Sequence, residues 1–132
     1  MGGLSDRFWN GAAAQLVNAI IAAVNARDFD ALERYATADL LFCDSRGGQI
    51  SGLARVIDWL RDVIAADPSF ALQVDAVTSS NGSALVTGTT VSRFFPEARR
   101  TLWRLTFSGG RVSEWRRYSA DPLPVPPPLT AH

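Results

Sequence analysis

Apolar residues recur every three or four positions through the first half of the chain, which is the spacing of helices that bury one face. We expect a first helix at 12–26, a short second helix at 30–36 and a third helix at 53–66, which Pro68 ends. The residues expected to cap these helices with a side-chain oxygen are Asn10, Asp30 and Ser51.

In the second half of the chain apolar and polar residues alternate, which is the pattern of strands that bury one face. The expected strands are 70–77, 84–94, 100–107 and 112–118. Asn81–Gly82 is a hairpin-turn signal, Pro96 interrupts the pattern, and a short apolar run at 40–43 predicts one earlier strand. Helices followed by an antiparallel meander predict an α+β fold with the helices on one face of the sheet.

Length and composition fit one globular domain followed by a tail. The chain has 132 residues and 47% of them are hydrophobic, enough to bury a core without a metal or a disulfide. We expect the domain to occupy residues 1–119. Residues 120–132 hold five prolines, which cannot join the interior of a sheet, so we expect an extended or disordered tail there.

The net charge and the lack of a recognisable secretory signal limit which binding partners and which cellular compartment we expect. The formal net charge is zero, so nothing electrostatic favours nucleic acid or an anionic membrane. Residues 1–11 lack the apolar run of a secretory signal, and the segment 12–26 is shorter than the roughly 20 residues of a membrane span. Cys43 is the sole cysteine and cannot form an internal disulfide. We therefore expect a cytoplasmic protein.

Several kinds of catalytic site are excluded by residue content. The sole histidine is His132, the last residue, which leaves no Ser–His or Cys–His dyad and no zinc site. Gly47–Gly48 is expected to be a turn, because it does not form a glycine-rich phosphate loop after a strand. Neither a metal nor a cofactor is expected.

Four short motifs resemble the nuclear transport factor 2-like superfamily, which includes ketosteroid isomerases and SnoaL-like cyclases. They are DFDAL at 28–32, ADLLF at 38–42, ISG at 50–52 and FSGGRV at 107–112. Their order and spacing cover about residues 12–119. The resemblance implies a cone-shaped fold, in which three N-terminal helices pack on a curved antiparallel sheet and enclose a pocket.

Asp44 is the candidate catalytic residue. It follows the strand at 40–43 and resembles the general base of ketosteroid isomerases, where an apolar cavity raises the carboxyl pKa towards working pH. The alternative is a turn-forming aspartate that bonds its own backbone. The isomerase oxyanion hole does not carry over, because its tyrosine and acid positions resemble Ile20 and Trp103 here.

Aromatic residues are expected to line the pocket. The candidate substrate-binding residues are Phe42, Trp59, Trp103, Trp115 and Arg117. By alternation, Trp115 and Arg117 share the inner face of one strand and Trp103 the inner face of its neighbour. Ordinary core packing is the alternative for each tryptophan. An inward Arg117 pairs with Asp44, holds a ligand carboxylate or enolate, or snorkels to water from the rim.

The opposite face of these strands carries charge. Its residues are Arg100, Arg104, Glu114, Arg116 and Tyr118. Alternating Arg and Glu suit a two-fold interface, so we expect a homodimer through this outer sheet face.

Three functions remain open at this point. The first is a cofactor-independent isomerase, cyclase or dehydratase that acts on a small apolar carbonyl compound with Asp44 as the general base. The second is a non-catalytic protein that binds a small apolar molecule in the same pocket. The third is a dimeric interaction module that uses the outer sheet face.

Overall fold

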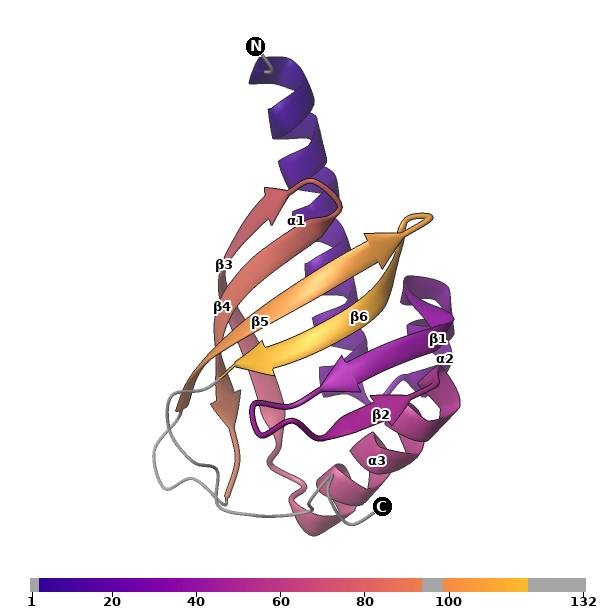
Figure 1. Cartoon of the computed structure of the whole chain (residues 1–132). Coiled ribbons are helices and arrows are strands. Elements are labelled where there is room, and N and C mark those ends of the chain that lie inside the picture. Colours follow the sequence, from indigo (N-terminus) through magenta and orange to yellow (C-terminus); the bar gives the residue numbers. More distant parts are fainter. Residues whose placement is uncertain (1–2, 94–98, 119–132) are drawn as a thin grey trace.

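The computed structural model describes residues 3–93 and 99–118 (Figure 1). The predicted interruption at Pro96 and the predicted tail at 120–132 lie outside the described residues. In order, the elements are α1 (Gly3–Ala26), α2 (Phe29–Tyr35), β1 (Ala36–Cys43), β2 (Gln49–Ser51), α3 (Leu53–Ala66), β3 (Ala71–Ser80), β4 (Ser83–Val91), β5 (Arg99–Ser108) and β6 (Arg111–Tyr118). None of the helices in these ranges is both long and apolar enough to cross a membrane.

The strands form one open sheet in the order β2-β1-β6-β5-β4-β3. Strands β3 to β6 make the predicted antiparallel meander, and β2 and β3 are the two edges of the whole sheet (Figure 1). The sheet is mixed rather than antiparallel throughout, because β1 pairs parallel with β6. This pair joins the last strand to the first, and periodicity along a sequence carries no information about such a distant partner. The α+β class and the three helices are as predicted.

Two helix starts differ from the prediction. Helix α1 begins at Gly3, so Asn10 lies inside the helix and does not cap it. Helix α2 is capped by Asp28, whose side chain accepts a hydrogen bond from the Ala31 N–H at 3.2 Å. Asp30 lies in the first turn instead, where a negative charge also favours the helix dipole.

Helix α3 has the predicted bounds but a different cap. Ser51 belongs to β2, a strand that we did not predict, and pairs there with Leu41 of β1. Gly52 is the N-cap, with a φ of 100° that glycine adopts without strain. Its N–H donates to the Leu40 carbonyl at 2.8 Å, so the helix starts directly from the sheet edge.

Helix α1 packs along the opposite edge strand, β3, and α3 packs against β1 and β2 (Figure 1). The end of α1 is fixed by Asn25, whose side chain exchanges two hydrogen bonds with the Leu72 backbone, at 2.7 and 2.9 Å. Asn25 therefore occupies the place of a further strand residue beside β3. Arg27 adds bonds to the carbonyls of Pro68 and Phe70.

The inner face of the sheet forms the core with these helices. One row of cross-strand neighbours runs through five strands and consists of Ala84, Leu105, Trp115, Phe42 and Ile50. All five are buried. The predicted alternation of β5 and β6 is confirmed, since Trp103 and Arg117 are buried on this face as well.

The core depends on one glycine beneath Trp103. Gly88 lies opposite the β3 bulge between Val74 and Ala76, where the sheet bends. A Cβ atom at Gly88 would clash with the Gln73 carbonyl oxygen and lie 2.6 Å from the Trp103 ring. Only glycine therefore lets the indole pack on the strand.

Gly88→Ala is expected to destabilise the protein by about 1–3 kcal/mol, because it overpacks the core. Chemical denaturation measures the change. Gly11→Ala is the matched control, since a Cβ there meets no atom within 4 Å, and it should leave stability equal or slightly higher. Equal stability of the two variants would show that the packing of Trp103 does not require a glycine at position 88.

A buried carboxylate joins α3 to the end of β4. Asp67 is completely buried, and one of its oxygens accepts from the Ser69 N–H at 3.1 Å and the Ser69 hydroxyl at 2.6 Å. The other oxygen accepts from the Ser92 hydroxyl and, at 2.8 Å, from the Arg93 N–H. Burial raises the pKa of Asp67, but these hydrogen bonds outweigh it and leave the pKa below its ordinary value.

Asp67 should make the free energy of unfolding depend on pH in the acidic range. Because its folded pKa is lowered, its contribution is present above the unfolded pKa of about 3.9 and is lost as pH falls through the folded value. At neutral pH the free energy of unfolding of wild type should exceed that of Asp67→Asn by about 1.5–3 kcal/mol. This difference should become smaller in acid. Urea titrations between neutral and strongly acidic pH measure this. Asp62→Asn, on the exposed side of α3, is the control. A gap that does not change with pH would argue against an ionised Asp67.

Candidate functional site

The β1–β2 hairpin places Asp44 at the edge of the inner face. Strand β1 ends at Cys43, and the Asp44 N–H donates to the Gly48 carbonyl at 2.9 Å, which continues the pairing of the two strands. Gly47 has a φ of 88° and donates to the Asp44 carbonyl at 3.3 Å. The two glycines therefore form the predicted turn.

The Asp44 side chain takes part in this turn. Its Oδ1 accepts from the backbone N–H groups of Arg46 at 2.9 Å and of Gly48 at 2.8 Å. Its Oδ2 accepts no hydrogen bond from any residue that the structure describes. One oxygen therefore holds the hairpin, as the turn interpretation expected, and the other remains available.

Arg117 lies beside Asp44 on the inner face. The parallel register pairs Cys43 with Arg116, so the next position sets Asp44 alongside Arg117, and Trp103 is the neighbour of Arg117 on β5. Arg117 is only 8% exposed. Within residues 3–93 and 99–118 its guanidinium makes no hydrogen bond, and no carboxylate lies within 4.0 Å of it. The direct Asp44–Arg117 ion pair that we considered is not formed.

The charge of Arg117 is poorly compensated. Burial lowers the pKa of Arg117, the Asp44 carboxylate offsets part of this effect, and Arg46 adds to the lowering. A buried guanidinium with five N–H donors is costly unless oxygens meet it. The Asp44 carboxylate therefore offsets only part of the cost of burying Arg117.

The four candidate aromatic residues form two ring pairs. Trp103 and Trp115 pack edge to face with centroids 6.1 Å apart, and Phe42 and Trp59 lie at 5.1 Å. Trp103 is 2% exposed and is a core residue. Trp59, from α3, is partly exposed, but its Nε1 is buried and lacks a hydrogen-bond partner among the described residues.

The sequence profile of the SnoaL-like domain matches residues 17–115, three quarters of the chain. The chain belongs to the SnoaL-like domain family. The fold agrees, because solved structures with ketosteroid isomerase-like and nuclear transport factor 2-like folds superimpose on it. No functionally curated protein matches the sequence.

Three of the similar solved structures have named activities. A proposed polyketide cyclase from Sinorhizobium meliloti is 22% identical, with a TM-score of 0.71 over 78% of this chain and 93% of the other. An epoxide hydrolase from M. tuberculosis is 20% identical, with a TM-score of 0.71 over 83% of each chain. A proposed ketosteroid isomerase from Kribbella flavida is 16% identical, with a TM-score of 0.74 over 90% and 85%. At these identities the likeness establishes the fold alone.

Ile20 and Trp103, the two positions that resemble the isomerase oxyanion hole, are buried core residues of this SnoaL-like domain. Ile20 has no donor to offer. The one cationic donor on the inner face of β6 is Arg117 within the described part of that strand.

Cys43 is in register with Arg116 of the outer face and is buried. Burial raises the pKa of its thiol, so it behaves as a small core residue. Among residues 3–93 and 99–118, no three His, Cys, Asp or Glu side chains lie close enough together to hold a metal ion.

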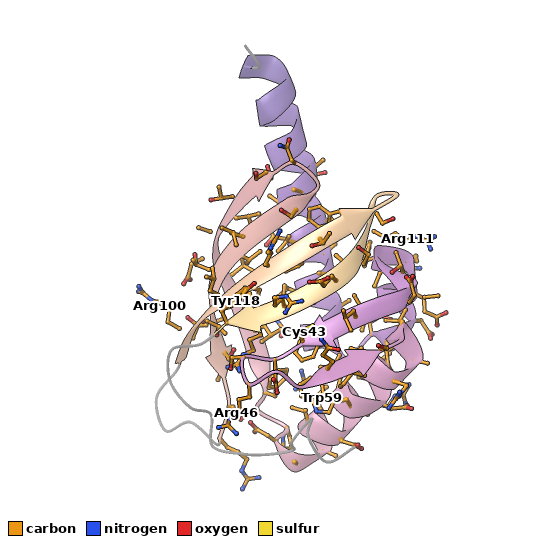
Figure 2. The ribbon with its side chains drawn as sticks, in the orientation of Figure 1. Cys43, Arg46, Trp59, Arg100, Arg111 and Tyr118 are labelled. Carbon is orange, nitrogen blue, oxygen red and sulfur yellow. The ribbon has the colours of Figure 1, made fainter. Side chains whose placement is uncertain are left out.

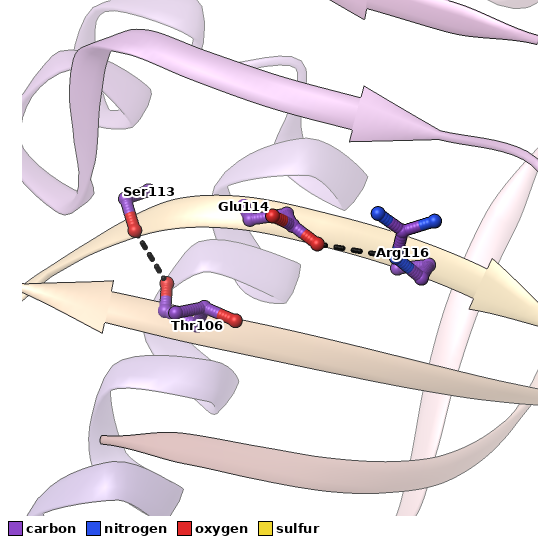
Figure 3. Close-up of polar contacts among 4 residues, drawn as sticks. All are labelled: Thr106, Ser113, Glu114 and Arg116. Atoms are coloured by element: carbon purple, nitrogen blue, oxygen red, sulfur yellow. Dashed lines mark hydrogen bonds and ion pairs between the residues drawn. The ribbon is translucent and has the colours of Figure 1, made fainter.

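The outer face carries the predicted charges. Arg104 is exposed, while Glu114 and Arg116 are partly exposed and joined by an ion pair of 3.1 Å (Figure 3). Figure 2 shows Arg100 and Tyr118 near one end of the sheet. The homodimer through this face stays a prediction.

Two substitutions distinguish the role of Asp44 in the turn from a role of its negative charge. Asp44→Ala removes the acceptor of two backbone N–H groups and should cost about 1–3 kcal/mol. Asp44→Asn keeps an oxygen for the same bonds and should cost less than about 1 kcal/mol. Denaturation midpoints measure both, with Ser45→Ala in the same exposed turn as the control. If Asp44→Ala were as stable as wild type, the turn would not depend on this side chain.

Proposed function

We propose that this SnoaL-like domain binds a small, largely apolar molecule through an oxygen anion, most simply a carboxylate, that pairs with Arg117. The observation that carries the proposal is Arg117, a residue only 8% exposed, whose guanidinium has no hydrogen-bond acceptor among the described residues. An unpaired buried charge raises the free energy of the folded protein. A ligand carboxylate would remove this cost, and the planar guanidinium fork matches it with two parallel hydrogen bonds.

The surroundings of Arg117 favour an apolar ligand body. Trp103 lies next to it across the sheet, and Trp115 precedes it by two residues on the same face. Phe42 continues this apolar surface onto β1. Aromatic faces with a single charged group are the usual composition of a small-molecule site.

Proton transfer is the second candidate function. Asp44 Oδ2 accepts no hydrogen bond from the described residues and lies next to Arg117 in the sheet register. Such a base could remove a proton beside a carbonyl while Arg117 stabilises the enolate, giving isomerisation, cyclisation or dehydration. The names of the similar cyclase and isomerase structures point the same way. Binding alone is favoured, because Oδ1 is already committed to the turn.

Binding should depend on Arg117. Isothermal titration with 2-naphthoate measures the affinity, and Arg117→Met should weaken it at least tenfold, which is about 1.4 kcal/mol. Arg104→Met, which removes an exposed arginine from the outer face, is the control and should bind like wild type. An equal loss of affinity in both variants would show that binding depends only on the net charge of the protein. Unchanged affinity in Arg117→Met would contradict the proposal.

Asp44→Asn separates the two candidate functions. A binding protein keeps its affinity for carboxylates in this variant. If wild type exchanges the α-protons of a bound keto compound with deuterium and Asp44→Asn does not, proton transfer replaces binding alone as the function.

A further inference from the structure

A second side-chain donor without a partner among the described residues lies on α3. The indole Nε1 of Trp59 is fully buried and has no hydrogen-bond partner among the described residues. A buried tryptophan N–H usually finds an acceptor, because leaving it unpaired loses the hydrogen bond that water would have made. Phenylalanine would give the same ring packing without this cost.

Trp59 and Arg117 flank the same pair of aromatic residues. Trp59 sits in the middle of α3, which packs on β1 and β2 (Figure 2), and its ring lies 5.1 Å from that of Phe42. Phe42 is in register with Trp115, and Arg117 is two residues beyond Trp115 on the same face. From strand spacing and rise, the Cα atoms of Phe42 and Arg117 are about 8 Å apart. Phe42, on which the Trp59 ring packs, and Arg117 therefore belong to one region of the inner face.

We propose that Trp59 is a ligand-binding residue whose indole N–H donates to a second oxygen of the molecule held by Arg117. An indole N–H only donates, so it selects an acceptor such as a ketone oxygen. The ligand class is therefore a compact aromatic or alicyclic oxo acid, with a carboxylate at one end and a carbonyl at the other. This inference rests on the proposed binding function and names the chemistry of its ligand.

The Trp59 Nε1 is shielded from bulk water, and the Arg117 residue is 8% exposed. Arg117 and the Trp59 Nε1 belong to different layers of the fold, the sheet and a helix. Two donors without a partner among the described residues, one on each side of the Phe42–Trp115 pair, match a ligand that carries an oxygen at each end. The competing occupant is an ordered water, which would satisfy Nε1 without selecting a ligand.

A matched pair of probes tests the inference. The compounds 4-acetylbenzoate and 4-isopropylbenzoate share a carboxylate, a ring and a similar shape, but only the acetyl group accepts a hydrogen bond. Wild type should bind the acetyl compound at least fivefold more tightly. Trp59→Phe should bind both compounds equally, with its affinity for the isopropyl compound unchanged from wild type. Arg117→Met should no longer bind either compound.

The indole signal of Trp59 gives a second readout. Its N–H resonance in a nitrogen-15 spectrum is assigned by its loss in Trp59→Phe or by contacts with the Phe42 ring, so the test does not require the variant to fold. The resonance should move downfield with the acetyl compound and not with the isopropyl compound.

The outcomes distinguish the two proposals. If wild type binds both probes equally and through Arg117, the occupant of Nε1 is water and the Trp59 inference is overturned, while the proposed function stands. If neither probe binds at millimolar concentration, the proposed function fails and this inference fails with it.

Discussion

The parallel pairing of β1 with β6 is the constraint on which the rest of the structure depends. Strand β6 joins the meander to the β1–β2 hairpin, so its register decides which of its side chains meet the helices. In the observed register Trp115 and Arg117 face inward, and Glu114 and Arg116 face outward. A slip of one residue would exchange these sets and place Arg117 on the outer face.

This register also explains the electrostatics of the inner face. It buries a guanidinium beside tryptophan rings and brings Asp44 near it without an ion pair. The hairpin then holds Asp44 in place, because its Oδ1 accepts two backbone N–H groups. The Arg117 guanidinium therefore has no acceptor among the described residues, and Trp59 of α3 adds one further N–H that lacks a partner there. Such an arrangement is suited to an oxygen-bearing ligand.

Several features that depend on neighbouring residues in the sequence were predicted correctly. The apolar stripe gave the bounds of α3, Asn81–Gly82 gave the β3–β4 turn, and alternation gave the inner faces of β5 and β6. The parallel β1–β6 pair depends on contacts between distant segments, which periodicity does not encode. The cap of α2 was misplaced because Asp28 and Asp30 both have suitable side chains two residues apart.

The candidate site was harder to predict than the fold. Burial of Arg117 followed from alternation, but the lack of an acceptor depends on the positions of side chains from several strands. The roles of Gly88 and Asp67 were not foreseen, since each depends on a partner from another element, Trp103 in one case and Ser92 in the other. Asp67–Pro68 carries a turn signal, which marks the end of α3 but does not reveal a buried carboxylate.

Arg117 is buried and has no partner among the residues that the structure describes. The free energy of unfolding of Arg117→Met, measured against wild type without ligand, tests this claim most directly. Methionine keeps the apolar stem and removes the charge, so the account predicts equal or greater stability. A loss of about 3 kcal/mol or more would show that Arg117 already has a partner that stabilises the fold, and would contradict the account.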